Sequence, residues 1–377
     1  MKKNQKSKIQ NQKFSKIIGI DPGTKSFDLF GIEFSNNKEK IFLDETIPSE
    51  KVAQDPGIIL TEIRNYLRVD AVIGPSGYGL PLTKLADAGD NELNQILPIE
   101  GENTGGVSVN EGIKRLFRKM KEMRLPVYFT PGVIHLTTVP KYRKLNRMDM
   151  GTADKLCCVV LAIKDQSERL KITANKTSFV LLEMGYGFTA AIAIRNGQVV
   201  DGLGGTSGFP GFLGTGHWDG ELAIRVGKER QGILFAGGAS SIAKKPIKGI
   251  SELPKHKETL ALLIESAIKN IACMLISHPK TKEIIFSGRL CREPFIYKEL
   301  YQQLTKHHPY LKINLVHRTA KIAKEATEGA VILGAGMLGI KYQSIFKSLK
   351  IAQAKGTMYD YITLPVEINK NGKNFSN

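Results

Sequence analysis

The stretch that decides the fold is Ile17-Ile18-Gly19-Ile20-Asp21-Pro22-Gly23-Thr24-Lys25-Ser26-Phe27-Asp28. An apolar run ends at a carboxylate, turns at Pro-Gly, passes two hydroxyls and a lysine, and resumes as an apolar run at residues 29–32. This order predicts a β-hairpin whose turn binds phosphate. Glycine lets an anion come close to the backbone, and the acid lies where hydrated Mg²⁺ could bridge it to the phosphate. A surface hairpin with an ordinary Asp-Pro-Gly turn is the structural alternative.

The same design recurs in Phe179-Val180-Leu181-Leu182-Glu183-Met184-Gly185-Tyr186-Gly187-Phe188-Thr189-Ala190-Ala191-Ile192-Ala193-Ile194. Asp21 corresponds to Glu183 and Gly23 corresponds to Gly185, both at an offset of 162 positions. A repeat of this length implies two related half-molecules, each opening with a hairpin. Hairpins that face each other across a cleft would place two phosphate-binding turns on opposite sides of one nucleotide.

These turns resemble the phosphate-1 and phosphate-2 turns of the superfamily that unites acetate and sugar kinases, heat-shock cognate chaperones and actin. In the expected order, residues 148–155 resemble its first connecting segment, 284–289 its adenosine turn, and the stretch from residue 328 its second connecting helix. The resemblance implies an α/β, duplicated actin-like (ribonuclease H-like) ATPase fold with a nucleotide cleft between two domains. Residues 149–155 and 201–206 look most like a mainly archaeal branch described as predicted butyrate kinases.

The resemblance implies ATP and Mg²⁺ as cofactors and assigns roles to individual residues. The expected catalytic residues are Asp21, Asp149 and Glu183, of which Asp21 and Glu183 would orient Mg²⁺ through water. The expected ligands of the ATP phosphates are Gly23, Thr24, Lys25, Ser26, Gly185, Tyr186 and Gly187. Adenosine is expected at Ser287, Gly288 and Arg289, and a substrate loop is expected at Gly204, Gly205, Thr206 and Asp219. Glu183 departs from the pattern, since such turns more often carry Asp.

Several of these acids have structural alternatives. Asp149 and Asp154 both fall at the start of an expected helix that runs to residue 163, where acids also serve as capping residues. In the functional interpretation one of them, preferably Asp149, projects into the cleft as a general base or as a ligand of Mg²⁺-bound water. Residues 202–216 are rich in glycine, so their backbone could wrap an anion or a small substrate. His217 and Asp219 end that loop as proton carrier and substrate anchor, or as the start of a helix.

Two later segments also have competing interpretations. Residues 331–339 contain Gly-x-Gly-x-x-Gly after an apolar run, the pattern of a dinucleotide-binding turn, but only 38 residues follow Gly339, too few for the required further sheet. Apolar residues keep helical spacing through the supposed strand, so the small residues predict close packing of two inter-domain helices. Arg289 could stack on a base, or it could be a solvated arginine after a strand.

The chain has 377 residues, of which 42% are hydrophobic and 24% charged, enough for two cores. We expect a disordered basic arm at 1–15, a first actin-like domain at 16–150, a second at 151–365 and a polar tail at 366–377. No apolar segment follows the charged start, and the most apolar expected helix, residues 259–276, contains two charges. We therefore expect no signal peptide, no membrane span and a cytoplasmic location, and we allow for a homodimer.

Lys and Arg number 54 against 36 Asp and Glu, and a net charge of +18 raises the question of a polyanionic partner. Six lysines and no acid lie in residues 1–16, and further basic clusters lie at 114–124 and 141–147. No interleaved aromatic residues accompany them, so we expect solvated faces and no specific nucleic acid. The four cysteines and seven histidines show no metal-ligand spacing, so a metal should arrive with the nucleotide.

The two turns and the resemblance together predict an ATP-dependent phosphotransferase, which would act by positioning its substrates and by electrostatic stabilisation. The acceptor is most simply a small carboxylate that enters between the domains, as in a butyrate kinase, and Arg147 and Arg225 are the expected arginines to direct it. The first alternative is an ATP-dependent conformational switch or assembly protein without kinase activity. The second is a polyanion-binding protein led by the basic arm.

Overall fold

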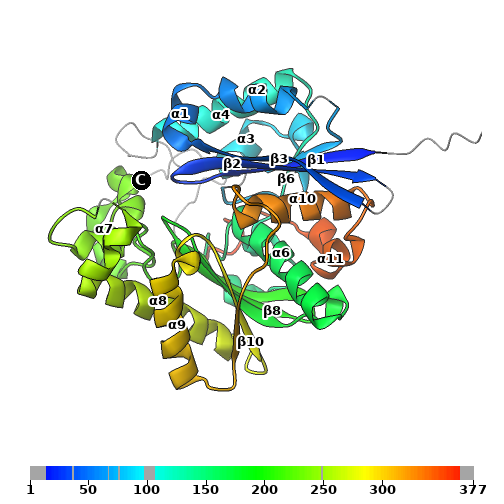
Figure 1. Ribbon diagram of the computed structural model, residues 1–377. Helices are drawn as coiled ribbons and strands as arrows, with labels where there is room; N and C mark the ends of the chain where they lie inside the picture. The colour runs from blue at the N-terminus through cyan, green and yellow to red at the C-terminus, as the bar shows by residue number, and fades with distance from the viewer. Residues whose placement is uncertain are drawn as a thin grey trace, which may run out of the picture.

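The computed structural model describes residues 14–35, 38–66, 68–74, 77–96, 107–247 and 249–365, and for 107–111 and 228–231 only the backbone. The expected polar tail, and the expected basic arm apart from its last two residues, lie outside the described residues. Figure 1 shows two sheets with helices between them and on their outer faces.

The first sheet opens with the hairpin predicted from residues 17–28. Its strands are β1 (Ser15–Pro22), β2 (Ser26–Ser35), β3 (Lys38–Pro48), β4 (Ala71–Ile73), β5 (Thr83–Lys84) and β6 (Val127–Phe129), in the order β3-β2-β1-β4-β6-β5. β1 pairs antiparallel with β2 and parallel with β4. Ile17 faces one core and Ile18 faces another, because successive side chains of a strand point to opposite faces.

The second sheet repeats this arrangement. Its strands are β7 (Phe179–Met184), β8 (Thr189–Arg195), β9 (Gln198–Leu203), β10 (Glu283–Ser287) and β11 (Lys312–Leu315), in the order β11-β10-β7-β8-β9. β7 pairs antiparallel with β8 and parallel with β10. Read from β3 and from β9, the two sheets have the same order and directions through five strands.

The register of the two hairpins confirms the repeat residue by residue. Asp21 pairs with Asp28 in the first hairpin, and Glu183 pairs with Ala190 in the second, each partner again 162 positions later. The second strand of each hairpin also has an irregularity at one equivalent place, after Gly31 in β2 and after Ala193 in β8. A bulge that recurs at the same position is a conserved element of the duplicated unit.

The helices form three layers around the sheets (Figure 1). The α-helices are α1 (Ser49–Gln54), α2 (Gly57–Arg64), α3 (Asp90–Ile96), α4 (Val107–Glu122), α5 (Lys141–Lys144), α6 (Ala153–Leu170), α7 (Gly220–Val226), α8 (Lys257–Ser277), α9 (Pro294–His307), α10 (Glu325–Met337) and α11 (Gln343–Ser348). Apolar residues of α1 to α4 cover the outer face of the first sheet, and those of α8 and α9 cover the outer face of the second. α6, α10 and α11 contribute to a core between the sheets.

α6 and α10 are the two inter-domain helices that the sequence predicts. α10 follows the second sheet in the chain but packs against β1 and β2 of the first sheet as well as against α6. The Gly-x-Gly-x-x-Gly pattern lies mostly within α10, which confirms that it is no dinucleotide-binding turn. The predicted close packing is also present, because a side chain at Gly329 would overlap the backbone carbonyl of Cys157.

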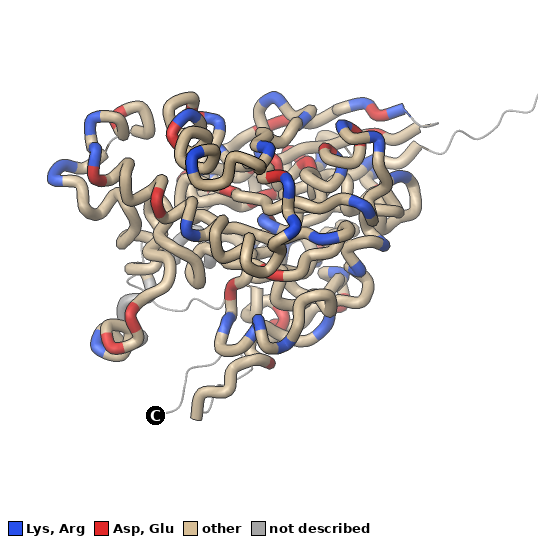
Figure 2. The backbone as a smooth tube through the Cα atoms, turned by 90° about the horizontal axis from the view of Figure 1, so that it is seen from below, with Lys and Arg blue, Asp and Glu red and all other residues tan. Residues whose placement is uncertain are grey.

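One helix among the described residues, α8, has the length and composition of a membrane-crossing segment. Leu263, Ala267 and Ile271 of this helix are buried in the core of the second half, so α8 is the core helix of a folded domain. Figure 2 shows Lys and Arg spread along the described chain, with Asp and Glu between them.

Candidate functional site

A cavity of about 250 Å³ lies between the turns of the two hairpins. Most of the residues singled out from the sequence line it: Asp21, Gly23, Thr24, Lys25, Ser26, Asp149, Glu183, Gly185, Tyr186, Gly187, Gly205, Thr206, Gly288 and Arg289. Gly204, Asp219 and Ser287 are not among its lining residues. The first turns of α6 and α10 form another part of the wall, so one cavity joins both halves of the repeat.

The two turns have the same internal hydrogen bond. Gly23 N–H donates to Ser26 O at 2.9 Å, and Gly185 N–H donates to Phe188 O at 3.0 Å. The amide of each glycine therefore closes its own turn, and the donors left for a phosphate are those of the residues that follow. Across the cavity, Lys25 Nζ lies 5.0 Å from the centre of the Tyr186 ring, so the turns face each other at short range.

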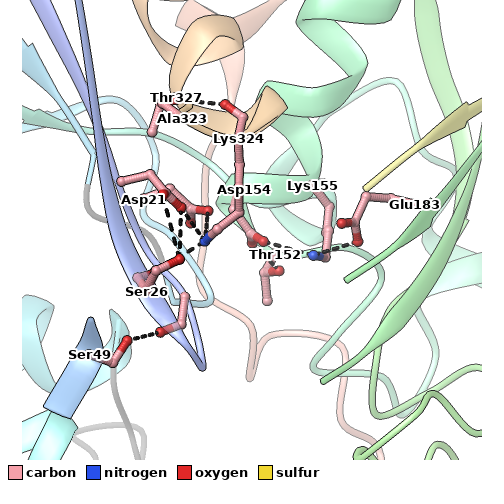
Figure 3. A network of polar contacts seen from close by, with 12 residues as sticks. Asp21, Ser26, Ser49, Thr152, Asp154, Lys155, Glu183, Ala323, Lys324 and Thr327 are labelled. Atoms are coloured by element: carbon pink, nitrogen blue, oxygen red, sulfur yellow. Dashed lines mark hydrogen bonds and ion pairs between the residues drawn. The ribbon is translucent and has the colours of Figure 1, made fainter. Parts of the chain in front are cut away.

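A lysine that the sequence analysis did not assign occupies the first turn. Lys324, the residue before α10, places Nζ 3.1 Å from Asp21 Oδ2 and 2.6 Å from Asp28 Oδ2 (Figure 3). Its ammonium also donates to Ser26 O at 3.2 Å. A Cβ on Gly23 would overlap Nζ of Lys324, so glycine at this position makes room for the ammonium.

A second lysine occupies the equivalent place in the second turn. Lys155, in the first turn of α6, places Nζ 2.5 Å from Glu183 Oε2 and 2.9 Å from Asp154 Oδ2 (Figure 3). Thr152 donates a further hydrogen bond to the Asp154 carboxylate. Each hairpin carboxylate therefore shares one ammonium with a second carboxylate.

Burial controls the ionisation of these groups. Burial raises the pKa of Asp21, and it raises the pKa of Glu183 to about 7 although Lys155 opposes the shift. Burial alone would lower the pKa of Lys155 and of Lys324, but the neighbouring carboxylates outweigh it and both values are raised. The two lysines therefore stay charged at neutral pH, while one carboxylate in each group of three holds a proton more readily than usual.

The carboxylates do not fit the metal-orienting role expected of them. Asp21 and Glu183 line the cavity, but the carboxylate of each already pairs with an ammonium of the chain. A cation beside each carboxylate repels a second cation at the same place. The expectation that Asp21 and Glu183 orient Mg²⁺ through water is therefore not supported.

Asp149 also lines the cavity, in the loop before α6 and not on the helix. Its carboxylate accepts hydrogen bonds from Gly151 N–H at 2.9 Å, Thr206 N–H at 3.1 Å and the Thr206 hydroxyl at 3.3 Å. Burial raises the pKa of Asp149, and these bonds oppose the shift. Gly204 packs against the carboxylate, so this part of the glycine-rich loop holds Asp149 in place. Tyr78 also lines the cavity.

The rest of the glycine-rich loop wraps a side chain of the protein. Gly205 and Gly214 lie against the Phe188 ring, and Leu213 N–H donates to Gly187 O at 3.0 Å. The loop thus supports the second turn. Asp219 is exposed and caps α7, where it accepts a hydrogen bond from Glu221 N–H at 2.9 Å. The structure therefore fits the helix-start alternative for Asp219 and not the expected place in a substrate loop.

The expected adenosine turn follows β10. Gly288 lies against the end of β7 and the Glu183 carboxylate, and Arg289 is exposed at the cavity wall, where it can cover a flat ligand. Ser287 is fully buried, and its hydroxyl has no hydrogen-bond partner among the described residues.

Lys155 could have been assigned from its place in the stretch 149–155, whereas Lys324 lies outside all of the stretches that carried the resemblance.

Comparison with solved structures assigns this architecture to the actin-like fold of acetate kinase, with two mixed α/β sheets in two domains. Acetate kinase from Entamoeba histolytica matches with a TM-score of 0.53 at 14% identity, over 78% of this chain and 87% of that one. A ROK hexokinase from Thermus thermophilus matches with a TM-score of 0.42 at 14% identity, over 84% and 96% of the two chains. At these identities the likeness concerns the fold alone.

By sequence, residues 19–364 match the family described as protein of unknown function (DUF1464), and the chain belongs to this family. A search of curated proteins gave no match. The chain therefore shares its fold with acetate kinase, and the family description adds no activity or substrate.

Proposed function

We propose that this protein is an ATP-dependent phosphotransferase that acts on a small acceptor. The observation that carries the proposal is the pair of equivalent hairpin turns, which face each other across one cavity that also contains a buried carboxylate, Asp149. Phosphoryl transfer needs positioned donors and charges and little covalent chemistry from the protein, which is what these turns offer.

In this proposal the nucleotide spans the cavity. The adenosine lies at Gly288 and Arg289, and the phosphates lie between the two turns, within reach of Lys25. Asp149 lines the same cavity, where it accepts the proton of the acceptor or orients it. Because Asp21 and Glu183 already pair with lysines, the proposal includes ATP but no metal held by these two acids.

The acceptor is the part of the proposal that rests on resemblance. A butyrate kinase-like enzyme would bind a small carboxylate, yet neither Arg147 nor Arg225 is among the residues that line the cavity, and the lining arginine is Arg289. A carboxylate such as Asp149 repels an anionic acceptor and attracts a hydroxyl. We therefore extend the acceptors to be tested from short-chain acids to alcohols and sugars.

The decisive experiment follows labelled phosphate from ATP into a panel of short-chain acids, sugars and polyols. We expect transfer to one class of acceptor, and Asp149→Asn should slow it by about 10²–10⁴ while leaving ATP affinity unchanged. Asp219→Asn is the matched control, because Asp219 is exposed outside the cavity and Asn also caps helices. Slow ATP hydrolysis that no acceptor stimulates, with assembly that follows the nucleotide, would favour the conformational switch instead.

A further inference from the structure

The ammonium groups of Lys324 and Lys155 lie beside Asp21 and Glu183, the two acids that the resemblance expects to orient Mg²⁺. Asp21 and Glu183 are the acids at the ends of the equivalent strands β1 and β7, and they are 6% and 5% exposed. Lys324 pairs with the first and Lys155 with the second (Figure 3). Each ammonium lies between two carboxylates, so each strand-end acid already has a cation of the chain beside it.

The two lysines occupy related places in the duplicated fold. Lys155 is in the first turn of α6, and Lys324 is the residue before α10, so each comes from the start of one inter-domain helix. Both line the cavity, with 13% and 23% of their side chains exposed. Two independent elements therefore deliver one cation to each half of the same cleft.

The position of Lys324 makes it part of the first phosphate turn. Its Nζ contacts the backbone of the turn at Ser26 O and lies where a side chain on Gly23 would be. An anion that approaches the turn meets this ammonium beside the backbone N–H groups. A lysine ammonium is a compact charge with three donors, and it binds phosphate oxygens directly.

The charges around each lysine also balance without a metal. Each group has one ammonium and two carboxylates, and burial favours a proton on Asp21 in the first group and on Glu183 in the second. With that proton each group is neutral. Lys25 and Arg289 then remain on the cavity wall as further cations for the phosphates.

We propose that Lys155 and Lys324 bind the terminal phosphates of ATP in place of a divalent cation oriented by Asp21 and Glu183, so that the cleft binds the nucleotide without metal. The inference rests on the proposed function for its ligand and goes beyond it in naming the groups that neutralise the phosphates. It distinguishes this cleft from one in which the strand-end acids orient a hydrated metal ion.

The first test uses the unaltered protein. Isothermal titration with ATP is carried out once in EDTA and once in excess Mg²⁺, and we expect dissociation constants that agree within about tenfold, a difference of less than about 1.4 kcal/mol. Affinity that falls by more than tenfold in EDTA overturns the inference while leaving the proposed function intact. Absence of ATP binding in both conditions overturns the two together.

The second test removes each ammonium. Lys324→Met and Lys155→Met should each weaken ATP binding in EDTA by about tenfold or more, since a direct charged contact is lost. Lys164→Met is the matched control, because Lys164 lies further along α6 and pairs with Glu168 outside the cavity. Equal affinity of wild type and both cleft variants in EDTA would contradict the assignment.

Loss of Lys324 alone leaves Asp21 and Asp28 buried without their cation, and this variant can fail to fold. The double variant Asp28→Asn, Lys324→Met removes one of these charges together with the lysine. It should retain the circular dichroism spectrum of the wild type and lose metal-free ATP binding by the same factor. A folded double variant that binds ATP in EDTA as the wild type does would also refute the inference.

Discussion

Gly329→Ala tests how closely the inter-domain helices α6 and α10 must approach. A Cβ at this position would overlap the carbonyl oxygen of Cys157 and lie 2.6 Å from its carbonyl carbon and 3.2 Å from its Cα. Ordinary contacts of this kind are about 3.5–4 Å, so the helices would have to separate by about 1 Å. The obstructing atoms are backbone, which cannot rotate away as a side chain can.

The cost follows from two opposing effects. Overpacking costs about 1–3 kcal/mol, and we expect the upper end because a whole helix must shift. Alanine is favoured over glycine in a helix by about 1 kcal/mol, which offsets part of that cost. The net loss is about 2 kcal/mol, or roughly 2–3 °C in Tm for a chain of this length.

Thermal and urea unfolding of Gly329→Ala measure this loss. Gly220→Ala is the control, because Gly220 begins α7 and a Cβ there meets nothing within 4 Å. The same shift moves the helix starts that carry Lys155 and Lys324, so ATP affinity should fall in Gly329→Ala and not in the control. A Tm equal to or above that of the wild type would refute the helix packing described here.

Three further outcomes are expected. Asp149→Asn should lower kcat for phosphate transfer by about 10²–10⁴ with ATP affinity unchanged, and an active variant in the label-transfer assay would contradict the role of this acid. The pKa of Glu183 is about 7 in the folded protein against an ordinary 4.5, so the stability that its proton contributes is present below pH 4.5 and lost as pH rises through 7. Between pH 5 and 8 the wild type should therefore lose up to about 3 kcal/mol relative to Glu183→Gln in urea unfolding, and parallel pH profiles would contradict this. Gly23→Ala should displace Lys324 and weaken ATP binding in EDTA by more than about tenfold, whereas unchanged binding would show that the ammonium need not lie against the turn.

The features that the sequence predicted are those encoded by neighbouring residues. The hairpins at β1–β2 and β7–β8 follow from apolar runs that end at an acid and a Pro-Gly or Gly-x-Gly turn, and the repeat follows from the common offset of 162 positions. The buried helix at residues 325–337 follows from apolar spacing with small residues. Such patterns are set by local backbone geometry, so they can be read without knowing where the chain goes next.

The resemblance also located the cavity, since most of the residues that it assigned line one space. It did not distinguish those that face a ligand from those that hold the loop. Asp219 ends a glycine-rich segment, so the sequence allowed both a substrate loop and the start of a helix, and the tertiary structure shows it capping α7. An acid at the start of a helix and an acid in a binding loop have the same local sequence, and the packing of the loop on Phe188 separates them.

The charge balance of the cleft was decided by tertiary structure alone. Lys324 reaches Asp21 across 303 positions of sequence, because α10 packs back onto the first sheet after the second sheet is complete. No periodicity or turn signal relates two residues so far apart. The contact forms because the burial of α10 in the core between the sheets fixes where that helix begins. The sequence by itself determined which acids end the strands, and only the fold determined that each acid meets a lysine.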